Sequence, residues 1–178
     1  MKGKKRTLVA LAVVLVVVAI ALFYFLVPRG FSFQDLQKGD VFQYKNLKWG
    51  AGEAAARLSW FKPMKEDYYQ GTSPGNELVN MSSDSCIING EKADVFFYFR
   101  DGQLYLMCFT VELDDSSAWF EKLLEDARAA FGQETDTTAT DSGITYYKWF
   151  VGDTQLQLIS TVSSGKGPSM ILIGPVER

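Results

Sequence analysis

The residue types that most often carry out chemistry form no catalytic constellation in this chain. Its 178 residues include two cysteines and no histidine. Histidine is the commonest general base and the commonest metal ligand, so both of these roles lack their usual residue. We therefore expect no enzyme activity, no cofactor and no metal site, although mechanisms built on carboxylates or lysine need no histidine.

Two acidic pairs and one glycine-rich segment come closest to a chemical motif. Asp114/Asp115 and Glu125/Asp126 resemble a catalytic or cation-binding dyad, but acids near a helix start ordinarily complement the helix dipole. Residues 164–167, SGKG, resemble a phosphate-binding loop. They lack the required spacing and lead into an expected strand instead of a helix. We expect neither feature to be a functional site.

The two cysteines are predicted to be buried free thiols. An Asn89-Gly90 turn pairs Cys86 with Ala93, so that Cys86 and Cys108 lie two strands apart and offset along the chain. Their separation is then roughly 10 Å or more. A disulfide needs Cα atoms closer than about 7 Å.

Residues 93–111 predict an aromatic β-hairpin around Asp101-Gly102, a strong two-residue turn signal. Counting from this turn, Tyr98 faces Tyr105 and Val95 faces Cys108. Both sides of the hairpin are apolar, so that either both are buried or one is a binding surface. One side carries Val95, Phe97, Phe99, Leu104, Leu106 and Cys108, and the other carries Phe96, Tyr98, Tyr105, Met107, Phe109 and Val111.

A second hairpin is predicted at residues 144–162, and its polarity indicates which side of the first hairpin is the surface. Its two arms and those of the first hairpin share a pattern, YFRDGQLYLM and WFVGDTQLQLI, which suggests two α-β-β-β repeats.

The expected helices span about 52–61 and 118–131, and the other strands span 78–88 and 170–173. Residues 62–76 and 133–143 are predicted loops. The fold class is thus α+β, with one antiparallel sheet and helices on one face.

The polar side of the second hairpin should face water, and its counterpart in the first hairpin is the side with Phe96 and Tyr98. Aromatic residues and methionine are enriched at protein interfaces. We therefore expect a non-enzymatic protein-binding module; a glycan or cell-wall polymer is the alternative ligand, and a loop folded over this face is the alternative structure. The predicted partner-binding residues are Phe96, Tyr98, Tyr105, Met107, Phe109, Lys148, Phe150, Gln155 and Gln157.

The N-terminal residues predict a membrane anchor. Residues 7–27 are uncharged and follow a tail, residues 1–6, with four basic side chains. This pattern is typical of a transmembrane signal anchor with a cytoplasmic N-terminus. A cleaved signal peptide ending at Ala19-Ile20-Ala21 is the alternative. The expected location is the cell membrane, with a juxtamembrane segment at 28–46 and an extracytoplasmic domain at 47–178.

The expected partners are this membrane and a protein, and no nucleic acid. Beyond the basic tail the chain carries 14 basic and 21 acidic residues. A domain with this excess of acidic residues has no stripe of positive charge that could bind the phosphates of a nucleic acid.

Several of these motifs together resemble a known group of proteins. Trp49-Gly50 before a helix, the DVFFYFRDGQLYL hairpin and a helix that ends in AAFG look like small extracytoplasmic bacterial proteins with tandem αβ repeats. This group includes β-lactamase-inhibitor-protein-like domains, small outer-membrane-assembly lipoprotein domains and membrane-anchored bacterial proteins. The resemblance covers about residues 47–173, and no cysteine follows the apolar run for lipidation. It implies a sheet with helices on one face and a partner protein on the other.

Overall fold

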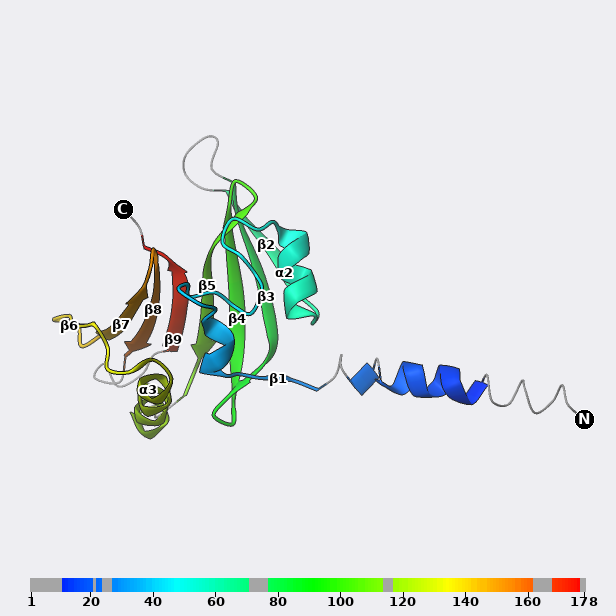
Figure 1. Cartoon of the computed structure of the whole chain (residues 1–178), viewed down its shortest axis with the longest axis horizontal. Helices are drawn as coiled ribbons and strands as arrows, with labels where there is room; N and C mark the ends of the chain where they lie inside the picture. The colour runs from blue at the N-terminus through cyan, green and yellow to red at the C-terminus, as the bar shows by residue number, and fades with distance from the viewer. Residues whose placement is uncertain are drawn as a thin grey trace, which may run out of the picture.

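A computed structural model describes residues 11–20, 22–23, 27–70, 77–113, 117–161 and 168–176. In these residues nine strands form one sheet in the order β1-β3-β4-β5-β9-β8-β7-β6, with β2 also paired to β3 (Figure 1). The strands are β1 (Arg29–Gly30), β2 (Lys65–Gln70), β3 (Glu77–Ile88), β4 (Glu91–Arg100), β5 (Gln103–Val111), β6 (Asp136–Ala139), β7 (Thr145–Val151), β8 (Thr154–Ser160) and β9 (Ser169–Pro175). The helices of the folded domain are η1 (Phe33–Leu36), α2 (Glu53–Trp60) and α3 (Ser117–Phe131).

The sheet is built from two three-stranded meanders. Tight turns join β3 to β4 and β4 to β5, and the residues before the turn glycines, Asn89 and Asp101, have positive φ angles of 48° and 52°. Asn and Asp tolerate this conformation better than most residues, as the sequence predicts. The last strands of the two meanders, β5 and β9, pair with each other antiparallel and join the meanders into one sheet.

The three helices pack on one face of this sheet. In α2 the buried residues are Ala56 and Trp60, at the i, i+4 spacing of one helix face. In α3 they are Phe120, Leu123, Leu124 and Ala127, also at helical spacing. Both sets belong to one hydrophobic core with the inward side chains of the two meanders. We call this covered side the inner face and the opposite side the outer face.

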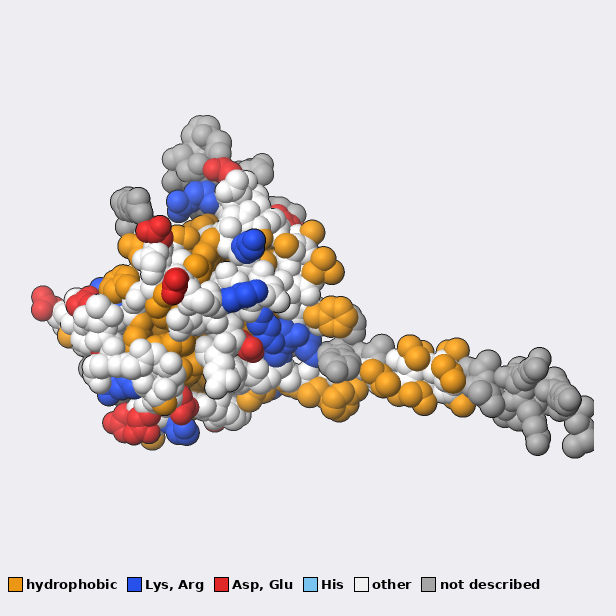
Figure 2. All heavy atoms as spheres, in the orientation of Figure 1, with side chains coloured by type: hydrophobic (Ala, Val, Ile, Leu, Met, Phe, Trp, Pro, Cys, Tyr) orange, Lys and Arg blue, Asp and Glu red, His pale blue; other side chains and the backbone are white. Residues whose placement is uncertain are grey.

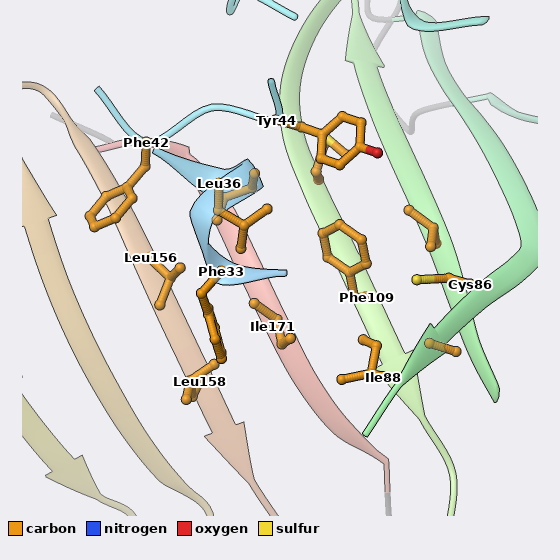
Figure 3. Packing of buried hydrophobic residues seen from close by; sticks show 14 of the residues in the cluster. Phe33, Leu36, Phe42, Tyr44, Cys86, Ile88, Phe109, Leu156, Leu158 and Ile171 are labelled. Carbon is orange, nitrogen blue, oxygen red and sulfur yellow. The ribbon is translucent and has the colours of Figure 1, made fainter. Parts of the chain in front are cut away.

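A chain of aromatic rings crosses the core from α2 to α3. Ring centroids lie 6.5 Å apart for Trp60 and Phe109, 5.3 Å for Phe109 and Phe31, and 4.9 Å for Phe31 and Phe33. Phe33 then contacts Phe131 of α3 at 5.7 Å. These rings meet edge to face, the geometry that aromatic pairs favour. Figure 3 shows Phe33 of η1 among Leu156, Leu158 and Ile171 of the second meander.

The segment 28–46, expected as a juxtamembrane linker, contributes several side chains to the core. Phe33, Leu36, Phe42 and Tyr44 are buried. Arg29 anchors the start of this segment, because its Nη1 donates to the Tyr44 hydroxyl at 2.7 Å and its guanidinium lies 5.4 Å from the Trp60 ring centroid. Alternating polar residues hid this packing in the sequence.

Three strands were missed, and the sheet is not purely antiparallel. The edge strands β2 and β6 lie within the predicted loops, and β1 pairs parallel with β3. Strands β1 and β6 are short, with two and four residues, and neither has an alternating apolar pattern. Pairing to a neighbouring edge makes such segments into strands, which their own sequence does not signal.

The transmembrane helix predicted over residues 7–27 is contradicted. Helix is described at 11–20 and 22–23, and no helix in the described part of the chain is long and apolar enough to cross a membrane. Hydrophobic side chains line the described helix (Figure 2). The predicted single-pass anchor and cell-membrane location are therefore overturned. Residues 1–10, 21 and 24–26 lie outside the described residues, as does part of the alternative cleavage site.

Candidate binding surface

The outer face carries most of the predicted partner-binding residues. One row crosses the sheet through directly paired positions, from Phe96 in β4 to Lys148 in β7. This row consists of Phe96, Cys108, Leu172, Gln157 and Lys148. Tyr98 pairs with Leu106 in the next outward row, and Gln155 pairs with Phe150. The sheet thus brings residues far apart in sequence onto one surface.

A β-bulge at Tyr105 changes the predicted register of the aromatic hairpin. Phe99 pairs with Leu104 as expected, but Tyr98 pairs with Leu106 instead of Tyr105. A bulge sets one extra residue on one strand, and every later residue of that strand then changes face. Leu106 and Cys108 consequently lie on the outer face, not under the helices.

The prediction that Met107 and Phe109 lie on the partner-binding face is wrong. Met107 pairs with Phe97 and Phe109 pairs with Val95, and all four side chains are buried in the core. Phe109 also contacts the ring of Trp60 in α2. Both are inner-face residues, and Leu106 and Leu172 take the outward positions that sequence reasoning missed.

Three aromatic side chains at the hairpin form a contiguous group, which we call the aromatic row: Phe96, Tyr98 and Tyr105. The Phe96 and Tyr98 rings are stacked with centroids 6.2 Å apart, and those of Tyr98 and Tyr105 are 6.4 Å apart. The guanidinium carbon of Arg100 lies 4.5 Å from the centroid of Tyr105, a cation–π contact at the end of the row. All three rings are half-buried, so that each keeps some surface in contact with solvent.

The second meander gives this face a polar half. Lys148 Nζ lies 2.9 Å from Asp136 Oδ2 of the edge strand β6, and this hydrogen bond lowers the pKa of the Asp136 carboxyl. Gln155 and Gln157 are half-buried, and Phe150 is 40% exposed. Lys148 therefore has a partner within the sheet already, whereas Phe150 is the most open of the predicted residues.

In the alternative structure, the loop at 62–76 or at 133–143 covers this face, but each of these segments contributes a strand to an edge of the sheet. Residues 65–70 form β2 beside β3, and residues 136–139 form β6 beside β7. Each extends the sheet instead of covering it. Residues 71–76 lie outside the described residues.

The prediction of two buried free thiols is confirmed. Cys86 points into the core and Cys108 lies on the outer face, so that the sheet itself separates them. Burial raises the pKa of the Cys86 thiol to about 12 and also raises that of Cys108. Neither sulfur has the lowered pKa of a reactive cysteine.

Of the weaker chemical motifs, only the pair Glu125/Asp126 lies in the described residues. Asp126 binds Lys122 at 2.7 Å and accepts from Asn89 at 3.3 Å, as a surface residue of α3. Among the described residues no group of three or more cysteines or acids could hold a metal ion. The pair Asp114/Asp115 and residues 164–167 lie outside the described residues.

No protein-family model, curated protein or solved structure matches this chain. The resemblance to tandem-repeat αβ domains consequently stays a prediction, carried by the motifs alone. The function must be argued from the surface itself.

Proposed function

We propose that this protein is a non-enzymatic protein-binding module, whose partner docks on the aromatic half of the outer face. The observation that carries the proposal is the aromatic row, three neighbouring rings that keep some exposure on the sheet face opposite the described helices. A sheet face that only needed to be solvated would carry polar side chains at these positions.

The arrangement suits a protein interface for two reasons. Tyrosine and phenylalanine bury a large area with little loss of side-chain entropy, and they dominate binding energy at interfaces. The neighbouring Leu106 and Leu172 extend the apolar area, and Gln155, Gln157 and Lys148 border it with polar groups. An apolar centre with a polar rim is the usual anatomy of a stable interface.

A photo-crosslinking experiment tests the proposal. The crosslinking amino acid p-benzoylphenylalanine replaces Tyr98 in the full-length chain, in cells that make the protein naturally, and adducts are identified by mass spectrometry. We expect one dominant protein adduct. Adding Phe96→Lys to the same chain should reduce its yield about tenfold or more, because a buried lysine charge opposes docking.

A matched control places the same crosslinker at Glu121, an exposed position of α3 on the other side of the molecule. Adducts that form equally at Glu121 and Tyr98 would contradict the proposal. So would a folded Phe96→Lys variant, with its near-UV circular dichroism unchanged, that keeps the full adduct yield.

A further inference from the structure

A separate pocket lies at the turn end of the β4–β5 hairpin, where the segment before α2 crosses these strands (Figure 1). Its volume is about 340 Å³. Leu104 lies buried beneath it, Trp49 and Tyr105 supply aromatic walls, and Arg100, Asp101 and Gln103 supply polar groups. Small-molecule sites in proteins are typically concave, mostly apolar and furnished with a few polar groups, at volumes from about 300 Å³ upwards.

Hydrogen bonds hold the Trp49 wall in place. The indole Nε1–H of Trp49 donates to the backbone carbonyl of Phe42 at 2.7 Å. The backbone next to Trp49 is bonded to Leu104 of the hairpin: Gly50 N donates to Leu104 O, and Leu104 N donates to Ala51 O, each at 2.9 Å. The loop therefore pairs with the hairpin like a short extra strand. A wall held in this way loses little entropy when a ligand binds.

The Tyr105 wall is held by the bulge. Tyr105 is the extra residue between the pairs Phe99–Leu104 and Tyr98–Leu106, and bulges of this kind redirect a side chain. Gly174 in β9 makes room for it, because a Cβ atom at this position would lie 2.9 Å from the Tyr105 carbonyl oxygen. The bulge and the glycine together give Tyr105 its position between the aromatic row and the pocket.

Three polar side chains line the pocket: Arg100, Asp101 and Gln103. Arg100 lies over the Tyr105 ring, with its guanidinium carbon 4.5 Å from the ring centroid. Gln103 places its amide oxygen beside Gly50, which has no side chain to cover it. Guanidinium, carboxylate and amide groups thus converge beside two aromatic rings.

We propose that this pocket binds a neutral saccharide ring. The apolar C–H face of a sugar packs on an aromatic ring, and its neighbouring hydroxyls both donate and accept hydrogen bonds. Asp101 accepts, Arg100 donates and Gln103 does both, so that together they match such a ring. A ligand with a carboxylate would meet Arg100 favourably but Asp101 unfavourably, and the whole chain carries a net charge of −3.

The inference does not rest on the proposed protein-binding function, with which it shares Tyr105 but neither Phe96 nor Tyr98. The test is an NMR titration of the ¹⁵N-labelled full-length chain with glucose, galactose, mannose and N-acetylglucosamine. Each sugar is raised to roughly 100 mM, because so small a ligand gains only a limited binding free energy. We expect saturable shifts of the Trp49 indole N–H and of the Gly102 and Gln103 amides with at least one sugar.

Two variants separate the pocket from its surroundings. Arg100→Gln should weaken the binding about fivefold or more, because a charged donor is lost. Lys92→Gln, on the same strand at its other end, is the matched control and should leave the binding unchanged. The inference is overturned if none of the four sugars shifts these signals, if sodium acetate shifts them in their place, or if Arg100→Gln binds as tightly as the unchanged chain.

Discussion

Neighbouring residues of one strand have opposite roles in this protein. Phe97 is fully buried and its ring lies 5.7 Å from that of Trp60, whereas Phe96 lies on the outer face and stacks on Tyr98. The alternation follows from the pleat of a strand, which points successive side chains to opposite faces. The same residue type therefore serves the core at one position and the candidate surface at the next.

An ion pair at the end of α3 should make the stability of the fold depend on pH. Arg128 donates to both carboxylate oxygens of Glu134, at 2.8 and 2.6 Å. These bonds lower the pKa of Glu134 from an ordinary 4.5 to about 2. Because the folded-state pKa is lowered, the stabilisation is present above about pH 4.5 and is lost as the pH falls towards 2.

We expect Glu134→Gln to lower the free energy of unfolding at pH 7 by about 0.5–1 kcal/mol, the range of partly exposed ion pairs. The difference from the unchanged chain should shrink towards zero near pH 2. Urea unfolding at several pH values measures it, with Glu121→Gln on the exposed side of α3 as the control. A penalty that stays constant down to pH 2 would contradict the role of the ionised pair.

At the scale of secondary structure, one bulge determines which residues the hairpin presents. Without it, Met107 and Phe109 would face outwards and Leu106 inwards, as the turn-based count predicts. With it, Met107 and Phe109 enter the core with Ile171 and Ile173 of β9. The composition of both faces of the first meander thus depends on one extra residue at Tyr105.

Gly174→Ala tests this dependence. The added Cβ would lie 2.9 Å from the Tyr105 carbonyl oxygen and 3.3 Å from the Leu106 side chain, so that β9 or the bulge must shift. We expect a loss of about 1–3 kcal/mol in the free energy of unfolding, as for other overpacked sites. The matched control is Gly30→Ala, where no atom lies within 4 Å of the added carbon. Equal stabilities of the two variants in urea would contradict the close approach.

At the scale of the whole molecule, the two meanders share one core. The segment around η1 links the two halves of the core, because Phe31 packs on Phe109 of β5 and Phe33 packs on Phe131 of α3. The β5–β9 pair joins them through the backbone. In the described residues, the buried side chains of both meanders belong to one hydrophobic cluster.

We therefore expect the described domain to unfold as a single unit. Near-UV and far-UV circular dichroism should give the same midpoint in urea, as a two-state transition requires. A fragment of residues 27–113 would remove Phe131 from its contact with Phe33 and leave β5 without its partner β9, and it should lack a cooperative transition. A fragment that unfolds cooperatively would show that the first meander is an independent domain.

The sequence alone determined the local features of this fold. Asn89-Gly90 and Asp101-Gly102 specify tight turns, the apolar spacing of residues 118–131 specifies α3, and the first and second hairpins have matching patterns. These are short-range signals that depend on dihedral preference and on periodicity. The two free thiols were also predicted correctly, because the strand order alone was enough to place Cys86 and Cys108 too far apart for a disulfide.

Only the tertiary structure decided which residues share the candidate surface. The bulge at Tyr105 lies against Gly174, 69 positions along the chain by their residue numbers, and no local pattern marks it. The short strands β1 and β6 exist because an edge of the sheet offers them partners. The pocket joins Trp49 to Arg100 and Tyr105 through hydrogen bonds between a loop and a hairpin. Long-range contacts of this kind form only in the packed chain. The turns of the first meander therefore predict which aromatic residues lie in the hairpin, but not the face of the sheet on which each of them lies.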